Sequence, residues 1–350
     1  MSLNIFRSLV FVGLFAANQA VLATDYQLPE NPTDSLIGEF LPGSNKEHPD
    51  KHFYTIASEE DTLLDIARRF NVGQTEILLA NPTVDRWLPK QGTKVRIPNR
   101  RLLPVAPREG IVINLPEYRM YYYPAKGESG YKKTVTTHPI SIGRIDWNTP
   151  LGQTRIAAKT TNPTWTPPES IKKEHAEKGD ILPDVVAAGP DNPLGLFAMR
   201  LGVPGYLIHS TNKPFGVGMS VTHGCIRMYP EDIEKLFPRV PVGTNVYIVN
   251  QPIKVGWLKD TLYLEVHPNL ENEKIDYEQR LEQALELIIQ ANNQDLPIID
   301  GATLKRTLKR RDGRPVAIYT RPEPKPATAH EAEKKADDAP SLVQEASVHK

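Results

Sequence analysis

The sequence contains a single cysteine, Cys225, in a chain of 350 residues. A disulfide within the chain is therefore excluded. The sequence also lacks a surplus of either charge, because 42 lysine and arginine residues balance 42 aspartate and glutamate residues. This balance gives no basis for nucleic-acid binding or for electrostatic attachment to a membrane surface. Its 39% hydrophobic and 24% charged residues are ordinary for a globular protein, and the length allows two or three domains.

Long apolar runs are missing after the N-terminal segment. Residues 1–23 combine Arg7 with an apolar run at 9–17 and the small-residue sequence Val-Leu-Ala at 21–23. This pattern is typical of a secretory signal peptide, so we expect an exported, soluble mature protein. A buried N-terminal helix is the alternative, and it is disfavoured because the cleavage pattern fits. A lone thiol outside the cell is liable to oxidation unless its chemistry is needed, which favours a chemical role for Cys225.

The residues around the cysteine are of types suited to acyl transfer. His209 and His223 lie sixteen and two residues before Cys225, and an imidazole can remove the proton from a thiol. Gly224 allows close approach of the backbone to a ligand, so the N–H groups of Gly224 and Cys225 can face a developing oxyanion. Arg227 supplies a guanidinium that can bind a carboxylate. The pattern predicts a cysteine acyl-transfer site.

Three other interpretations fit parts of this pattern. A lone cysteine is often a small buried hydrophobe beside a hydrogen-bonded histidine. A metal site made of His209, His223 and Cys225 has suitable ligand types, but the His-x-Cys pair is too close for an ordinary structural zinc pattern. A cysteine peptidase of another lineage would typically carry its cysteine on a helix, whereas Cys225 follows Thr-His-Gly in a loop. We therefore expect no metal and no cofactor.

The order His-Ser, a loop, and then Thr-His-Gly-Cys-Ile-Arg resembles the signature of the L,D-transpeptidase (YkuD) family. An early family motif, Gly-x followed by Thr-Pro-x-Gly, matches Gly143-Arg144 and residues 149–152. The Pro-rich stretch around Trp165 resembles the segment that covers the active-site groove in this family. The resemblance covers residues 110–250. It implies a mostly β domain of mixed sheets with short helices, in which Cys and His lie on neighbouring elements facing one cleft.

The resemblance also implies roles for individual residues. Cys225 would be the nucleophile, and His209 would deprotonate it and later protonate the leaving amine. Ser210 would orient the His209 ring, often through its backbone carbonyl in this family. His223 would line the cleft and either tune the thiolate or bind substrate. Tyr206 is a candidate groove residue.

The reaction implied by the resemblance is that of a peptidoglycan L,D-transpeptidase, whose partners are stem peptides and glycan strands. The thiolate attacks the carbonyl of the third stem residue and expels the terminal D-alanine, while Arg227 binds a stem carboxylate. The acyl group then passes to the third residue of another stem, giving a 3→3 cross-link, or to a lysine of an outer-membrane lipoprotein. Transfer to water would make the enzyme a carboxypeptidase. A non-catalytic glycan-binding protein is the remaining alternative, but it would be expected to have lost Cys225 or His209.

Residues 53–98 predict a small module with two strands and two helices. FYTI and TKVRIP have strand composition, and TLLDIARRF and TEILLAN have apolar residues at helical spacing. Asp61 is expected to cap the first helix. The order resembles a LysM module, which binds glycan strands of cell walls; a structural domain without a ligand is the alternative. Signal, LysM module and YkuD domain in this order resemble a periplasmic Gram-negative group, so we expect a periplasmic protein.

The remaining segments complete an α+β fold of several domains. We expect an extended lead-in at 24–52 and a Pro- and Arg-rich linker at 99–109. Residues 251–321 predict a C-terminal subdomain with an amphipathic and a basic helix. Residues 322–350 are rich in Pro, Ala and charge and are expected to be disordered.

Finer expectations concern the 110–250 segment and three histidines. Ile111–Leu115 and Tyr118–Tyr123 predict a hairpin whose tyrosines pack within a sheet. A helix is expected to begin at Pro230 and to end at Pro238. Three histidines without an evident partner are expected at the surface: His138, His175 and His267.

Overall fold

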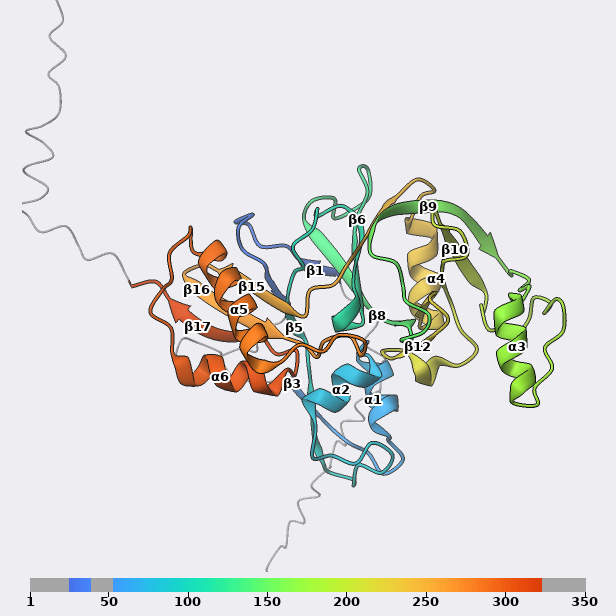
Figure 1. Ribbon diagram of the computed structural model, residues 1–350, viewed down its shortest axis with the longest axis horizontal. Coiled ribbons are helices and arrows are strands. Elements are labelled where there is room, and N and C mark those ends of the chain that lie inside the picture. Colours follow the sequence, from blue (N-terminus) through green and yellow to red (C-terminus); the bar gives the residue numbers. More distant parts are fainter. Residues whose placement is uncertain (1–24, 39–52, 323–350) are drawn as a thin grey trace, which may run out of the picture. The chain divides into compact units, whose positions relative to one another are not determined.

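The computed structural model describes residues 25–38 and 53–322 (Figure 1). The expected signal peptide at 1–23 and all but the first residue of the expected tail at 322–350 lie outside the described residues. The described residues up to Tyr319 belong to one compact unit. Among the described helices, none is long and apolar enough to cross a membrane.

The central region is built from two mixed β-sheets that share their two longest strands. Its strands are β1 (Asp25–Gln27), β6 (Gly110–Asn114), β7 (Arg119–Tyr123), β8 (Thr134–Gly143), β9 (Gly152–Thr161), β10 (Phe197–Leu201), β11 (Leu207–His209), β12 (Ser220–Thr222), β13 (Ile226–Met228) and β14 (Asn245–Val249). The first part of β8 pairs with β1 and β7, and its last residues pair with β13 and β12. The first half of β9 pairs with β14 and the second half with β10. Since β8 and β9 pass from one sheet into the other, the two sheets enclose one core.

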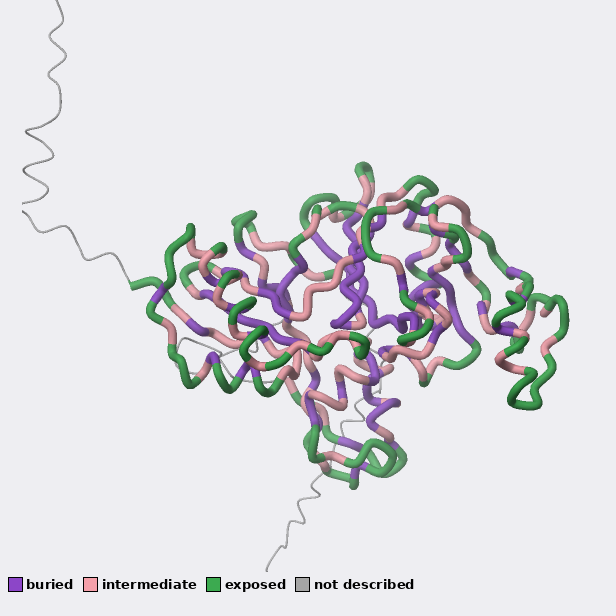
Figure 2. Tube along the Cα trace, in the orientation of Figure 1, coloured by how far each residue is buried: buried purple, intermediate pink, exposed green. Residues whose placement is uncertain are grey.

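The expected hairpin of β6 and β7 is confirmed. The two strands pair antiparallel and are joined by a 3-10 turn, Leu115–Glu117. Every residue of β7 is buried, so its tyrosines do pack within the sheet. Strands β6, β7 and β8 are almost entirely buried, whereas β9 has a single buried residue. Figure 2 shows buried stretches at the centre of this region and exposed connecting loops.

Helix α4 (Pro230–Arg239) covers part of this core. Pro230 stands at the start of the helix, where its missing N–H costs nothing, and Ile233 and Leu236 are buried against the strands. The sequence predicted that the helix ends at Pro238, and this prediction is wrong. Pro238 lies inside the last turn, which continues to Arg239. A proline there removes a single hydrogen bond near a terminus and is therefore tolerated.

Residues 53–98 form a strand, two helices and a strand, in the expected order. They are β3 (Phe53–Ile56), α1 (Leu63–Arg69), α2 (Gln74–Ala80) and β4 (Lys94–Ile97). The prediction that Asp61 caps α1 is wrong. Thr62 is the N-cap, and its hydroxyl accepts the Asp65 N–H in a capping box. The Asp61 carboxylate instead accepts hydrogen bonds from Ser58 and pairs with Arg69.

The start of α2 contacts the loop between β11 and β12. The Gln74 N–H donates to the Val217 carbonyl at 2.9 Å, and the Thr75 N–H donates to the Gly218 carbonyl at 3.2 Å. Helix N-termini have unsatisfied N–H groups, so the loop supplies the acceptors that α2 lacks. Gly218 has φ +91°, and a Cβ there would lie 2.3 Å from the Gln74 nitrogen. The module therefore holds one end of this loop in place.

A buried ion cluster joins the same module to the central sheets. Glu76 of α2 accepts from Arg119 of β7 at 2.6 Å and from Arg101 at 3.2 Å. Both guanidiniums are almost completely buried, at 1% and 4% exposure of their side chains. Glu76 thus provides the carboxylate shared by two buried cations, and its loss would be costly.

The C-terminal subdomain packs two helices on a three-stranded sheet. The elements are β15 (Ile253–Leu258), β16 (Thr261–Val266), β17 (Val316–Thr320), α5 (Tyr277–Ala291) and α6 (Gly301–Arg310). Apolar side chains of both helices and of β15 and β16 form one core. In the expected lead-in and linker, β2 (Leu36–Gly38) and β5 (Arg100–Leu102) pair antiparallel.

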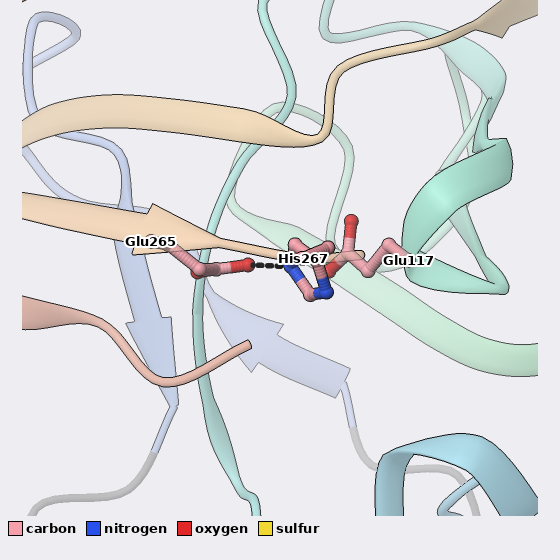
Figure 3. Close-up of side chains that lie close together, drawn as sticks. All are labelled: Glu117, Glu265 and His267. Carbon is pink, nitrogen blue, oxygen red and sulfur yellow. Dashed lines mark hydrogen bonds and ion pairs between the residues drawn. The ribbon is translucent and has the colours of Figure 1, made fainter. Parts of the chain in front are cut away.

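A buried polar network lies between the central region and this subdomain (Figure 3). The Lys254 ammonium lies 2.9 Å from Glu117 and 2.7 Å from Glu265, and the His267 ring lies 2.6 Å from Glu265. Burial raises the pKa of Glu117, but Lys254 and His267 more than offset it and lower that pKa to about 2. Because the ammonium already lies between the carboxylates, the cluster is an ion network. The surface prediction for His267 is wrong, since the network gives it a buried partner.

The surface prediction is also wrong for His138, which is buried on β8 with Nδ1 3.4 Å from an Asp232 carboxylate oxygen. His175 is partly exposed, but it does have a partner, since its Nδ1 lies 2.7 Å from Asp180. Asp232 belongs to the distant helix α4, and Asp180 lies three residues after the end of the helix that carries His175.

Candidate active site

Cys225 lies in the turn between β12 and β13, directly before β13. β13 runs parallel to β11, and His209 lies opposite Arg227. Continued by one residue, this register places Cys225 opposite Leu207. Because side chains alternate along a strand, Cys225 and His209 lie on the same face. With strands about 4.8 Å apart and residues about 3.3 Å apart, their Cα atoms are diagonal neighbours at roughly 8 Å.

The thiol of Cys225 is partly accessible and is directed toward a backbone oxygen. Its Sγ lies 3.6 Å from the Gly205 carbonyl, to which it can donate. Burial raises the pKa of the thiol, whereas the Leu207 backbone and the Arg227 charge act in the opposite direction. The net shift is upward, so the resting side chain at neutral pH is a protonated thiol.

The imidazole of His209 is buried and neutral. Burial lowers its pKa to about 3, the charge of Arg227 adds to this effect, and the Ser210 and Leu194 backbones oppose it. The Nδ1 atom is buried without a hydrogen-bond partner. In the described structure no hydrogen bond joins the His209 ring to Cys225 Sγ. The site at rest therefore contains a neutral thiol and a neutral base.

The backbone at Gly224 requires a glycine. Its φ is +98°, and a Cβ would lie 2.7 Å from the ring of Tyr206, which packs directly against it. The Thr149 hydroxyl donates to the Gly224 carbonyl at 2.9 Å. Because the C=O and N–H of one peptide unit point in opposite directions, the N–H of Cys225 is directed away from Thr149. The loop is thus fixed in a single orientation.

His223 contacts residues that the sequence did not single out as its partners. Its Nε2 lies 3.0 Å from Oε2 of Glu174, a residue of α3 (Glu169–Glu177) that is 49 positions away. The same oxygen accepts a hydrogen bond from Arg144, and the Trp147 ring meets the His223 ring edge-on at 5.1 Å between centroids. Burial lowers the pKa of His223, and Glu174 acts against this. No local pattern could have revealed this pairing, because α3 and the turn are brought together only by the fold.

Ser210 and Arg227 flank the His209 position. Ser210 is buried, and its N–H donates to the Phe197 carbonyl at 2.9 Å. Arg227 is half-buried, and its Nε has no hydrogen-bond partner. Burial lowers the pKa of Arg227, and Cys225 opposes this shift.

Comparisons with known proteins identify the family of this chain. The model of the YkuD family, the L,D-transpeptidase catalytic domain, matches residues 108–248. Three relatives come from Escherichia coli strain K12. Probable L,D-transpeptidase YcfS is 41% identical over 80% of this chain and 86% of its own length. Probable L,D-transpeptidase YbiS is 38% identical over 87% and 97%, and Probable L,D-transpeptidase ErfK/SrfK is 37% identical over 88% and 94%. The chain therefore belongs to the YkuD family and is an L,D-transpeptidase.

Proposed function

We propose that this enzyme uses Cys225 as nucleophile and His209 as base on peptidoglycan stem peptides. The observation that carries the proposal is the parallel pairing of β11 and β13, whose register, continued by one residue, puts Cys225 on the same face as His209. Rotation of the thiol from the Gly205 carbonyl toward the imidazole would bring the two within reach. Catalytic hydrogen bonds are often long before substrate binds.

The reaction then proceeds in two steps. His209 takes the thiol proton as Cys225 Sγ attacks the carbonyl of the third stem residue, and the Cys225 and Gly224 N–H groups stabilise the oxyanion. The C–N bond to the terminal D-alanine breaks, its amine receives the proton from His209, and a thioester remains. An amine attacks the thioester and loses a proton to His209. The C–S bond breaks, and His209 gives the proton to the departing Cys225 thiolate. Arg227 binds a carboxylate of the stem, Ser210 orients the His209 ring, and Tyr206 lines the groove.

Intact-protein mass and D-alanine release test this mechanism. Wild type mixed with a stem tetrapeptide should gain the mass of the acyl group and release D-alanine, and Cys225→Ala should do neither. A folded wild-type protein that forms no adduct and releases no D-alanine would refute it. Adding a second tetrapeptide or a lysine-ended lipoprotein peptide distinguishes the acceptors by product mass. Hydrolysis alone would identify a carboxypeptidase.

We also propose that residues 53–98 are a LysM module that holds the enzyme on glycan strands in the periplasm, after a signal at 1–23 is removed. The β-α-α-β order supports this, as does the exposed Trp87, which is 61% accessible. Trp87→Ala in the full chain should reduce co-sedimentation with purified peptidoglycan. Ile298→Ala, at a 95% exposed position in the C-terminal subdomain, is the control. Equal sedimentation of both variants and wild type would contradict a glycan contact at Trp87.

A further inference from the structure

The segment between β9 and β10 contacts the turn that contains His223 through the side chain of Glu174. This segment, residues 162–196, carries α3, and Ile171 is the buried residue of that helix. It is held together by the Trp165–Val186 bridge and by Asn192, whose side-chain amide donates to the Pro163 carbonyl at 2.9 Å. From α3, Glu174 extends to the turn that contains His223.

Glu174 makes three charge-assisted contacts. Its Oε2 accepts from Arg144 and lies 3.0 Å from His223 Nε2, and its Oε1 accepts from Lys178 at 2.7 Å. Hydrogen bonds from Arg144, then Lys178 and His223, hold the pKa of Glu174 far below its usual range. The group is therefore a carboxylate, which can only accept hydrogen bonds.

The tautomer of His223 follows from that contact. A neutral imidazole carries a proton on one nitrogen only, and Nε2 must be the donor when its partner is a carboxylate. Nδ1 is then left as an acceptor. The edge of Trp147 limits rotation of the same ring. His223 is held in one orientation and one protonation pattern by residues that do not belong to the motif around Cys225.

We propose that Glu174 is a positioning residue for the reaction: it fixes His223 as the Nε2–H tautomer and fastens the 162–196 segment to the Cys225 loop. Its catalytic part rests on the proposed function. A purely structural surface ion pair is the competing explanation. Such pairs contribute little on their own, and their loss would leave the His223 tautomer unchanged.

Two variants at Glu174 separate these explanations. Glu174→Ala removes the acceptor, and Glu174→Gln keeps the shape with a weaker one. Glu169→Ala, on the same helix, is the matched control because within residues 25–38 and 53–322 Glu169 pairs with Lys172 alone. We expect Glu174→Ala to lower kcat for D-alanine release by about 10- to 100-fold, with KM changed less than about 3-fold. Glu174→Gln should have a kcat between those of Glu174→Ala and wild type. Glu169→Ala should match wild type.

The readout that a structural role would not move is the ring ¹⁵N spectrum of His223, assigned with His223→Gln. Wild type and Glu169→Ala should show the Nε2–H tautomer, and Glu174→Ala should show a mixture. Unchanged tautomer and kcat in Glu174→Ala would overturn the proposal; Glu174→Gln decides it if the alanine variant does not fold. The spectrum needs no turnover, so a wild type without D-alanine release would reject the proposed function while the tautomer still decides this inference.

Discussion

The resting state of the nucleophile can be tested directly, because Cys225 is the only thiol in the chain. The perturbation is pH, and the reporter is the rate of alkylation by iodoacetamide, which reacts with the thiolate. Burial raises the pKa of Cys225 and lowers that of His209 to about 3. At pH 6.5, where a free imidazole would be half protonated, only about one His209 ring in 3,000 carries a charge.

A neutral pair predicts a steep pH profile. Below the thiol pKa the thiolate fraction rises tenfold per pH unit, so the alkylation rate should rise about 100-fold between pH 6.0 and 8.0. A thiolate–imidazolium pair would instead react at a nearly constant rate across that range. Pseudo-first-order rates followed by intact mass give the profile, with the protein unfolded in urea as the reference for an ordinary thiol. A plateau below pH 7 would refute the neutral pair and the role of burial in setting it.

Four further outcomes follow from the packing. Glu76→Gln leaves two buried arginines without their carboxylate and should lower the free energy of unfolding by about 3 to 5 kcal/mol in urea titrations, with exposed Glu59→Gln as control; a loss below about 1 kcal/mol would contradict this. Gly224→Ala forces a positive φ and a ring clash, so its D-alanine release should fall at least tenfold, about 1.4 kcal/mol of barrier, and wild-type rates would disprove the requirement. Lys254→Met leaves two buried carboxylates without the ammonium that they share and should destabilise by about 3 kcal/mol or more at pH 7 and by less at pH 4; equal losses at both pH values would argue against the ion network. Between about pH 3 and pH 6.5, His209 binds a proton in the unfolded chain but stays neutral in the folded chain. The free energy of unfolding should therefore fall as the pH is lowered through this range, and it should fall less in His209→Gln. Parallel curves for the two proteins would show that His209 is not buried in its neutral form.

Local chemistry in the sequence was sufficient to place the candidate nucleophile and most of the elements around it. Cys225, His209 and Gly224 stand in one short stretch, and their residue types and spacing were enough to predict an acyl-transfer site. The tyrosines of β7 were enough to predict a strand. Periodicity also predicted the two helices of the 53–98 module, and Pro230 marked the start of α4. The errors at Asp61 and Pro238 are errors of helix ends, where neighbouring residues compete for one hydrogen bond.

Contacts between distant segments were decided only by the tertiary structure. The partner of His223 is Glu174, and the acceptors for the start of α2 are carbonyls of the loop before β12. His138 is buried beside Asp232 of α4. His267 is buried between Glu265, two residues earlier in the chain, and Glu117 of the distant 3-10 turn. Each of these contacts pairs a charged group or an unsatisfied N–H with a partner that the fold brings close. The sequence determines which charged and polar groups need a partner. Which partner lies within reach is determined only by the packing of the sheets and helices.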